Sequence, residues 1–329
     1  MLEPVLYLTS IASGGAGAWI IGNYGNRIGL IDEPNERSSH ESPTPKGGAI
    51  GILAAFLFAA FLVEIPWLFW APAGVLALLS LFGDQLDLSP SFRLVFQFSA
   101  AVVLITGTRE FDLIYMNRLL LIILLGVFVV GTANIYNFMD GIDGIAAITG
   151  IVSFGLLALS NFLWGGERSF SILSICMSMS CLGFLPYNMP KAKVFMGDVG
   201  SVLLGFVFAA IVVSLSKSFL DFVCLVSFLF PFYADELTTM AVRVKDGENL
   251  LKPHRRHFYQ LLANEYSIPH WKISTGYGVF QLVVGLTVLL AKPHGILVVL
   301  SLLFAFFTAF IFLSFSVRRK LAVTSQQVL

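Results

Sequence analysis

Charged residues are scarce in this chain. Asp, Glu, Lys and Arg make up only 12% of its 329 residues, whereas hydrophobic residues make up 57%. Because a soluble domain carries roughly 25% charged residues, this composition excludes that class and indicates an integral membrane protein. The formal net charge is zero. That balance argues neither for nor against nucleic acid, and we expect no nucleic-acid partner.

Cysteine is equally scarce, and so are signs of processing. The three cysteines (Cys176, Cys181 and Cys224) lie inside apolar segments. An odd set without metal-ligand spacing excludes a disulfide framework, so we interpret these residues as packing residues. The first apolar stretch lacks a basic leader and a small-residue cleavage site, which predicts a retained helix rather than a signal peptide. We find no low-complexity segment and no soluble domain.

What the chain has in abundance is long apolar runs, separated by polar or Pro/Gly breaks. They predict an all-α integral membrane protein, a single polytopic domain over 1–329 with about eleven transmembrane helices. These helices are expected near 4–22, 48–63, 67–82, 93–108, 117–136, 144–164, 168–186, 199–216, 218–240, 272–291 and 295–316. The loops expected to carry a site are 23–47, 83–92, 137–143, 187–198 and 241–271.

Lys and Arg are unevenly divided between the two sides of this predicted bundle. Fifteen of the twenty fall in odd-numbered gaps or the C-terminal tail, and five fall in even-numbered gaps. Since cytoplasmic loops are enriched in basic residues, the N-terminus is predicted outside and the C-terminus in the cytoplasm. All five loops named above then face the cytoplasm.

Five aspartates (Asp84, Asp87, Asp140, Asp143 and Asp198) collect on that same side. Each carboxylate costs roughly 2.5–3.5 kcal/mol at the centre of a membrane helix, so five at one membrane face predict a functional site. Asp84 and Asp87 lie one helical turn apart beside Arg93, where a local ion pair is the simpler interpretation.

The segment 134–144 reads Asn-Ile-Tyr-Asn-Phe-Met-Asp-Gly-Ile-Asp-Gly. Asn134, Asn137 and Asp140 are spaced by three, which would place them on one face of a helix end. The alternative is a polar helix end followed by a turn, but a plain turn needs no paired Asn and paired Asp.

A second motif, Phe-Met-Gly-Asp-Val-Gly-Ser at 195–201, precedes a helix expected to begin near 199. Asp198 could simply cap that helix. Phe195, three residues earlier, suits stacking on a nucleobase.

Basic residues gather in two of the same loops. His254, Arg255, Arg256 and His257 are consecutive in the largest loop, and Arg37, His40 and Lys46 precede Gly47-Gly48 in the first loop. The enrichment of cytoplasmic loops in basic residues, or a plain linker, would account for them. As functional groups, Arg binds phosphate oxygens, His moves protons, and glycines before a helix offer backbone N–H groups to phosphate.

Carboxylates alone would repel an anionic substrate, whereas the Arg and His clusters would attract one. Both make sense together if a hard cation, Mg²⁺, bridges aspartate oxygens to a diphosphate. The pattern therefore predicts phosphoryl transfer at the membrane boundary, where a soluble nucleotide donor and a lipid acceptor could meet.

These motifs resemble those of the polyprenyl-phosphate N-acetylhexosamine-1-phosphate transferases, glycosyltransferase family 4, from about residue 29 to residue 260. Three segments carry the resemblance: 32–48 (Asp-Glu-Pro-Asn-Glu-Arg-Ser-Ser-His, then Pro-Thr-Pro-Lys-Gly-Gly), 134–144 and 195–201. The run His-Arg-Arg-His-Phe-Tyr-Gln at 254–260 is most similar to the branch that initiates O-antigen synthesis.

The resemblance implies an enzyme of the bacterial inner membrane with an active site facing the cytoplasm. With Mg²⁺ it would transfer an N-acetylhexosamine-1-phosphate, of the GlcNAc or 6-deoxy type, from a UDP-sugar to undecaprenyl phosphate. UMP would be released, and O-antigen or another cell-envelope glycan would be initiated. A homodimer is possible, and the residues do not decide between a one-step transfer and a covalent intermediate.

The same resemblance implies residue roles. Asp198 would hold Mg²⁺, and Phe195 would stack on uracil with Asn188 and Asp143 near the nucleoside. The catalytic set would be Asp84, Asp87, Asp140, Asp143 and His257; the substrate-binding set would be Arg37, His40, Lys46, Asn134, Asn137, Asn188, Phe195 and Arg255.

One position departs from the family pattern, which usually has adjacent aspartates where this chain has Gly83-Asp84. The missing carboxylate is often assigned to deprotonating the lipid phosphate. Asp84 or Asp87 could replace it, or no base is needed, because a phosphate monoester with a second pKa of about 6 is largely ionised near neutral pH. The alternatives are a catalytically weakened relative and a lipid-carrier transporter or flippase. Transporters usually place ionisable groups near the bilayer midplane, which counts against the second.

Overall fold

The computed structural model describes residues 2–34, 39, 42–83, 88–108, 117–250 and 254–327. The predictions made for Arg37, His40, Asp84 and Asp87 therefore lie outside the described residues.

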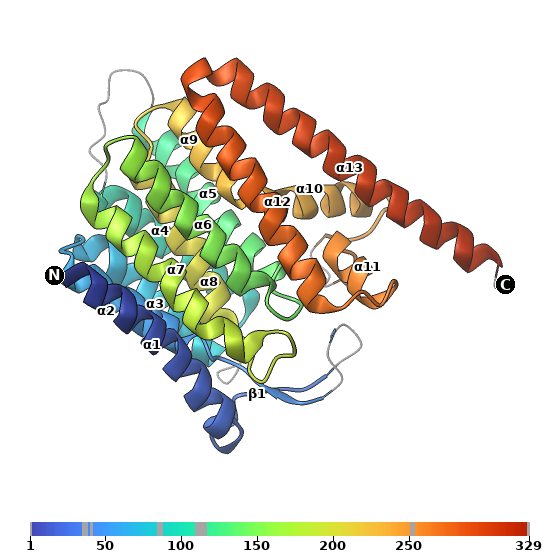
Figure 1. Ribbon diagram of the computed structural model, residues 1–329, viewed down its shortest axis with the longest axis horizontal. Coiled ribbons are helices and arrows are strands. Elements are labelled where there is room, and N and C mark those ends of the chain that lie inside the picture. The colour runs from blue at the N-terminus through green and yellow to red at the C-terminus, as the bar shows by residue number, and fades with distance from the viewer. Residues whose placement is uncertain are drawn as a thin grey trace.

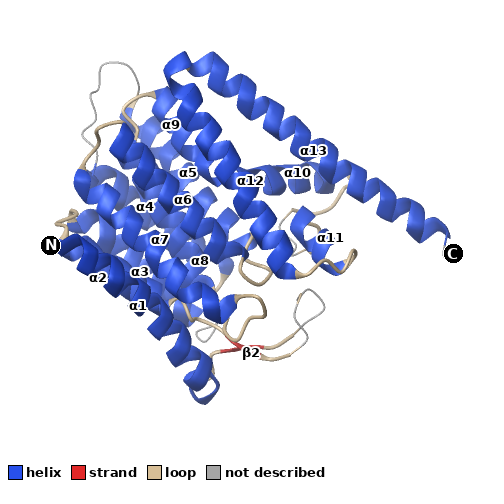
Figure 2. Ribbon diagram, in the orientation of Figure 1, coloured by secondary structure: helices blue, strands red, loops and turns tan. Residues whose placement is uncertain are grey.

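Almost all of the described chain is helical (Figures 1 and 2). The α-helices are α1 (Leu2–Tyr24), α2 (Ile50–Leu62), α3 (Trp67–Gly83), α4 (Pro90–Thr108), α5 (Arg118–Phe138), α6 (Ile145–Leu163), α7 (Arg168–Asn188), α8 (Asp198–Leu215), α9 (Phe219–Val226), α10 (Phe230–Lys245), α11 (Phe258–Asn264), α12 (His270–Ala291) and α13 (Ile296–Gln327). Three 3₁₀ turns, η1 (Gly25–Ile28), η2 (Ser227–Leu229) and η3 (Lys292–His294), join them. Strands β1 (Ile31–Asp32) and β2 (Thr44–Pro45) pair antiparallel.

Helix α8 forms the centre of the bundle. Its side chains are apolar all round, and nearly all of them from Val199 to Val213 are buried. A helix without a polar face must be enclosed on every side, and α2, α3, α4, α5 and α6 pack around it. The central helix therefore presents its first residue, Asp198, at one end of the bundle.

Helix α1 packs against α2 and α7 at backbone contact distance. A Cβ atom built on Gly14 would lie 2.0 Å from the carbonyl oxygen of Ser180 in α7, and one on Gly183 would lie 2.0 Å from that of Ile11. These positions admit only glycine, in the way that small residues allow membrane helices to approach closely.

The structure confirms an all-α membrane protein and modifies the predicted helices. Among the described residues, eight helices are long and apolar enough to cross a membrane, and α2 and α3 are shorter apolar helices. The single helix predicted over 218–240 is wrong, because the chain breaks into α9, η2 and α10. Pro231 lies in the first turn of α10, where its missing N–H costs nothing, and so a new helix begins there. The number of spans and their orientation stay predictions.

Helix α13 leaves the bundle. It turns back after α12 and then runs outward, so that its C-terminal end projects well beyond the other helices (Figure 1). Only 11% of the most apolar 18-residue stretch of α13 is buried inside the protein, compared with 83% of the corresponding stretch of α8.

Candidate functional site

The first loop and the segment before α8 are joined by backbone hydrogen bonds. Phe195 donates its N–H to the Pro45 carbonyl at 2.8 Å, and the Phe195 carbonyl accepts from Gly48 N–H at 3.0 Å. Ala49 N–H likewise donates to the carbonyl of Met196 at 3.3 Å. The prediction that backbone N–H groups at this turn are free to bind phosphate is therefore wrong for Gly48 and Ala49, because both N–H groups already donate to carbonyls of the neighbouring loop. Lys46 pairs with Phe195 in a parallel bridge and is half-buried.

Asn188, at the end of α7, joins two further loops. Its side-chain oxygen accepts from Gly144 N–H at 2.8 Å, and its amide nitrogen donates to the Val194 carbonyl at 3.0 Å. Gly144 has a φ of 82°, the left-handed conformation that glycine adopts without strain. Asn188 is buried and holds the loops on either side of the site in place; its predicted contact with a nucleoside stays a prediction.

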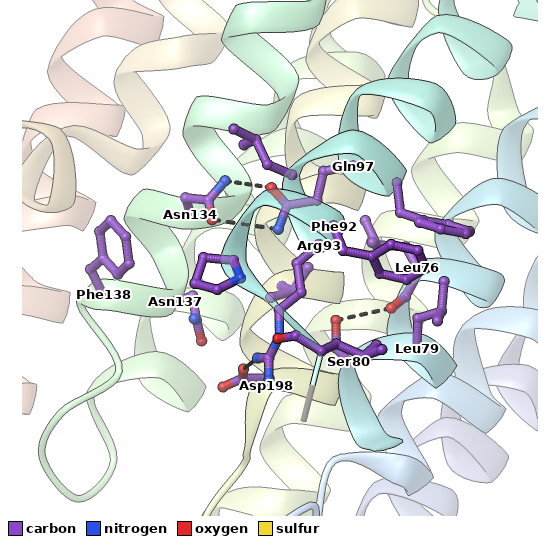
Figure 3. Close-up of a pocket in the computed structure, with 15 residues that line it drawn as sticks. Leu76, Leu79, Ser80, Phe92, Arg93, Gln97, Asn134, Asn137, Phe138 and Asp198 are labelled. Carbon is purple, nitrogen blue, oxygen red and sulfur yellow. Dashed lines mark hydrogen bonds and ion pairs between the residues drawn. The ribbon is translucent and has the colours of Figure 1, made fainter. Parts of the chain in front are cut away.

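The two asparagines of α5 face different neighbours. Asn134 exchanges amide hydrogen bonds with Gln97 of α4, at 2.7 and 3.4 Å, as Figure 3 shows. The Asn137 side-chain oxygen accepts from the Ser201 hydroxyl of α8 at 2.6 Å. Asp140 does not share a helix face with them as predicted, because α5 ends at residue 138 and Asp140 lies in the following loop. Gln97 was not predicted as part of this site.

Asp198 begins α8, where the partial positive charge of a helix N-terminus favours a carboxylate. Its Oδ2 lies 3.1 Å from Nη1 of Arg93 in α4, and both side chains are about one-third exposed (Figure 3). The structure therefore pairs Arg93 with a residue 105 positions away, and the predicted local ion pair with Asp84 or Asp87 lies outside the described residues.

Asp140 and Asp143 complete a group of three carboxylates with Asp198. Burial, and then the negative charges of Asp198 and Asp143, raise the pKa of Asp140 to about 7. Nδ1 of His270, the first residue of α12, lies 3.2 Å from Asp143 Oδ2. His270 was not predicted, since no local motif marks a histidine that meets its partner 127 residues away.

This carboxylate group fits a hard divalent cation. Among the described residues, no three His, Cys, Asp or Glu side chains converge closely enough to hold a metal ion by themselves. Mg²⁺, however, is commonly held by one or two carboxylates, water and substrate phosphates. Two features fit that use: the donors are carboxylate oxygens only, and the pKa of Asp140 is raised by burial and then by repulsion from Asp198 and Asp143, which a cation would relieve.

Asp235 of α10 anchors α11 beside this group. The carboxylate is fully buried and accepts hydrogen bonds from Phe258 N–H at 2.8 Å, Tyr259 N–H at 3.3 Å and the Tyr277 hydroxyl at 2.7 Å. A fourth comes from the Thr239 hydroxyl of α10 at 3.1 Å. The Tyr259 hydroxyl then donates to the carbonyl at the end of α5, 3.1 Å away. Asp235 thus holds α11, and the basic residues just before it, against the loop that carries Asp140 and Asp143, which we call the aspartate loop.

His257 lies inside this support. It is 3% exposed, with Nδ1 3.8 Å from Asp235 and Nε2 3.6 Å from Glu236. Its predicted catalytic role stays a prediction, and in this structure the ring is positioned to hold α11. Both carboxylates fall within the helix that we predicted over 218–240, and a carboxylate pair in an apolar run was the signal that could have identified them.

The neighbouring arginines lie further out. Arg255, predicted to bind substrate, is half-buried with its guanidinium 3.8 Å from Glu265. Arg256 pairs with Asp246 at 2.6 Å and with Glu248. The two carboxylates raise the pKa of Arg256, and hydrogen bonds from Arg243 and then from Arg256 lower the pKa of Glu248.

Two pockets flank the carboxylate group. The first, which we call the helix-side pocket, has a volume of about 400 Å³ and is lined mainly by apolar residues of α3 and α4, with Arg93, Asn137 and Asp198 at its polar end (Figure 3). The second, the loop-side pocket, has a volume of about 150 Å³ and is lined by residues of four loops and helix ends. Its described lining comprises Asp32, Ser39, Asp140, Gly141, Ile142, Asp143, Asn188, Phe195, Gln260 and His270.

Gly83, at the end of α3, faces Arg93, the cationic side chain that lines the helix-side pocket. A Cβ built on it would lie 3.1 Å from Cζ and 3.2 Å from Nη2 of Arg93. The position at which the family usually has its first aspartate is therefore filled, in this chain, by the guanidinium that pairs with Asp198.

Comparison with known proteins points to one family. The profile of glycosyl transferase family 4 matches residues 66–216. The chain is 28% identical to the decaprenyl-phosphate N-acetylglucosaminephosphotransferase of Mycobacterium leprae, over 74% of this chain and 72% of that protein. It is 28% identical to a probable undecaprenyl-phosphate N-acetylglucosaminyl 1-phosphate transferase of Bacillus subtilis, over 72% and 70% of the two chains. It is 29% identical to the undecaprenyl-phosphate alpha-N-acetylglucosaminyl 1-phosphate transferase of Escherichia coli K12, over 72% and 70%.

The matched region contains α3 to α8, and thus every described residue that lines the helix-side pocket and the three clustered aspartates. The relatives are all named as transferases of a sugar phosphate to a polyprenyl phosphate. These matches support the assignment of this chain to glycosyl transferase family 4, the polyprenyl-phosphate N-acetylhexosamine-1-phosphate transferases.

Proposed function

We propose that this protein transfers N-acetylhexosamine-1-phosphate from a UDP-sugar to undecaprenyl phosphate and releases UMP, with Mg²⁺ as cofactor. One observation carries the proposal: two pockets of different character meet at a single carboxylate group. Asp198 lines the helix-side pocket, Asp140 lines the loop-side pocket, and the charge of one raises the pKa of the other. A lipid phosphate and a nucleotide diphosphate bound on the two sides would bring their reacting atoms together there.

The helix-side pocket suits the acceptor. Its wall of α3 and α4 carries side chains such as Leu76, Phe92 and Phe96, which match an isoprenoid chain in a bilayer. Arg93 is the one cationic side chain among the described residues that line it, and a guanidinium binds phosphate oxygens in pairs. The lipid phosphate would thus lie beside Asp198.

The loop-side pocket suits the donor. Phe195 offers an aromatic face for the base, and Asn188, Asp143 and Gln260 offer hydrogen-bonding groups around it. Asp143 is kept in place by the contact of its carboxylate with His270 and by the hydrogen bond from the Ser274 hydroxyl to its backbone carbonyl at 2.7 Å. Such support from neighbouring side chains holds binding groups in a fixed geometry.

Asp198 and Asp140 would hold the Mg²⁺ ion together with the donor's phosphates. When bound, the ion would neutralise negative charge that grows on the phosphate oxygens during transfer. The protein's own part is to align the acceptor phosphate with the donor, which requires little covalent chemistry.

The names of the relatives favour GlcNAc as the sugar and a bacterial membrane as the setting. The excess of Lys and Arg in the site's loops supports an active site that faces the cytoplasm. The resemblance of 254–260 to the O-antigen-initiating branch supports a role at the first step of a cell-envelope glycan.

UMP release from purified protein tests this function. The reaction contains undecaprenyl phosphate, one of a panel of UDP-N-acetylhexosamines, and Mg²⁺ or EDTA. We expect release with one donor, highest with UDP-GlcNAc, and none with EDTA or with Asp198→Asn. Asp221→Asn is the matched control, because Asp221 also lies in the first turn of a helix but pairs with Lys292, away from both pockets.

Two results would contradict the proposal. One is the absence of UMP from every donor while a relative is active in the same assay, which would favour a weakened or carrier-binding relative. The other is undiminished turnover in EDTA, which would remove Mg²⁺ from the proposal while leaving the transferase intact.

A further inference from the structure

Helices α11, α12 and α13 enclose a third pocket that shares no residue with the helix-side or loop-side pocket. Its volume is about 450 Å³. We call it the α13 pocket and define it by Phe258 and Leu262 of α11, Ile273 and Gly276 of α12, and Phe310 and Leu313 of α13. We propose that the α13 pocket binds the acyl chain of an anionic phospholipid whose headgroup lies against the basic residues at its loop end. Lipid binding itself does not rest on the proposed function.

The shape of the pocket follows from the divergence of α13. Phe280 and Phe310 stack with ring centroids 6.3 Å apart, which fastens α13 to α12 on one side of the pocket. On the other side, the Arg318 guanidinium donates to the Arg256 carbonyl at 2.8 Å, and the Tyr266 hydroxyl donates to the Val317 carbonyl at 3.3 Å. The pocket lies between these two attachments, where α13 diverges from the bundle (Figure 1).

The lining specifies an apolar occupant. Apart from Lys272, every lining side chain presents hydrocarbon or an aromatic ring, and the one hydroxyl, that of Tyr277, is turned away to Asp235. Water would find no hydrogen-bond partners in such a space, so in a bilayer it would be filled by an acyl chain. Gly276 keeps the space open, since a Cβ built on it meets no atom within 4 Å.

The rim specifies the charge of the headgroup. Lys272 lies at the loop end of the pocket, exposed beside Trp271, with its Nζ 5.6 Å from the indole centroid. Val317, which lines the same end, is followed by Arg318, which fastens α13, and then by the exposed basic residues Arg319 and Lys320. Basic pockets between membrane helices on the cytoplasmic side are recognised by anionic headgroups, and Trp and Tyr mark the level of the headgroups. A zwitterionic lipid would fill the same pocket but would gain less from this rim.

The pocket is coupled to the support of the candidate site. Phe258 and Tyr277 form part of its wall, and both donate hydrogen bonds to the buried Asp235. An acyl chain in the pocket therefore packs against the same residues that hold α11 in place. We expect the bound lipid to stabilise α11 and, through the Tyr259 contact, the aspartate loop.

The test compares two lipids with identical acyl chains, dioleoylphosphatidylglycerol and dioleoylphosphatidylcholine. Binding to the delipidated full-length protein is measured by native mass spectrometry, and thermal stability is measured in parallel. We expect phosphatidylglycerol to bind more tightly and to raise the melting temperature. Lys272→Gln should weaken phosphatidylglycerol binding about five-fold, since a Lys near an anionic headgroup contributes about 1 kcal/mol. Lys217→Gln, an exposed lysine of another loop, is the matched charge control.

The pocket itself is tested by filling it. Gly276→Leu should lower the affinity for phosphatidylglycerol at least ten-fold and abolish its stabilising effect. Gly131→Leu is the matched control, because Gly131 is also a helical glycine whose added Cβ meets no atom within 4 Å, and it lies outside the pocket. The melting temperature of each variant without lipid shows that it is folded.

Three outcomes would overturn the proposal. Equal binding of the two lipids would remove the headgroup preference, and unchanged binding to Gly276→Leu would place the lipid elsewhere. Displacement of phosphatidylglycerol by equimolar undecaprenyl phosphate would assign the pocket to the acceptor lipid. Loss of turnover without any change in lipid binding would concern the proposed function alone.

Discussion

The substitution Gly83→Asp separates two explanations of the family's missing aspartate. A Cβ at position 83 would lie 3.1–3.3 Å from the guanidinium atoms of Arg93. That contact is with the far end of a flexible side chain, so the guanidinium can move by a few tenths of an ångström. The new carboxylate would then contact Arg93 and compete with Asp198, which the guanidinium now meets at 3.1 Å.

The expected change is in acceptor affinity rather than in the chemical step. Ion pairs between partly exposed side chains contribute about 0.2–1 kcal/mol, so a competing carboxylate should raise the KM for undecaprenyl phosphate by up to about five-fold. If a missing base limited the reaction, restoring it would raise kcat by about 10²–10⁴. The acceptor phosphate is already largely ionised at neutral pH, so we expect kcat to change by less than about two-fold.

The assay is steady-state UMP release with varied undecaprenyl phosphate at saturating donor, for the wild type, Gly83→Asp and Gly83→Asn. The asparagine has nearly the same size without the charge, and we expect it to leave the acceptor KM close to that of the wild type. A rise in kcat of ten-fold or more in Gly83→Asp alone would refute this reasoning and show that the base is needed. An equal rise in KM for both variants would assign the effect to bulk.

Three further predictions concern stability, each measured as a melting temperature in detergent. Tyr277→Phe removes one of four hydrogen bonds to the buried Asp235 carboxylate and should cost about 1.5–3 kcal/mol, whereas Tyr266→Phe, at an exposed hydroxyl, should cost less than about 0.5 kcal/mol; similar losses would contradict the role given to Asp235. The pKa of Asp140 is raised to about 7, so its contribution to stability is complete below about pH 4 and is lost as the pH rises to 7. Asp140→Asn should therefore flatten the dependence of the melting temperature on pH in this range, and Mg²⁺ should stabilise the wild type more at pH 8 than at pH 5. Parallel pH profiles of the variant and the wild type would count against the carboxylate group. Lys292 forms an ion pair with Asp221 at 2.6 Å, and its Nζ lies 3.2 Å from the indole centroid of Trp164. Lys292→Ala should lower the free energy of unfolding by about 1–3 kcal/mol. An unchanged melting temperature would show that these contacts are exposed in solution.

Most helices could be predicted from the sequence because each membrane helix corresponds to a long apolar segment. The ends of α3, α6 and α7 fall within two residues of the predicted ones. The break at 227–230 was missed because the run stays apolar across it, and only Pro231 marks the start of a new helix. The short helix α11 was missed because its position depends on Asp235, which caps it from another element.

The site could be predicted where it is written in consecutive residues. The loop of Asp140 and Asp143 and the start of α8 at Asp198 lie at one end of the bundle, as the motifs indicated. The contacts of His270, Gln97 and Asp235 could not be predicted, since each joins residues between 23 and 127 positions apart and follows no periodicity. The same holds for the contact of Gly83 with Arg93, which depends on the packing of two helix ends.

The close contact of α1 with α7 has a consequence for the order in which the protein is made. Gly14 and Gly183 allow the two backbones to touch, yet they are 169 residues apart in the chain. At about 5–20 residues per second, a ribosome would need roughly ten to thirty seconds to reach the second after the first. The first helix must therefore wait in the membrane, with its glycine face uncovered, until its partner has been inserted.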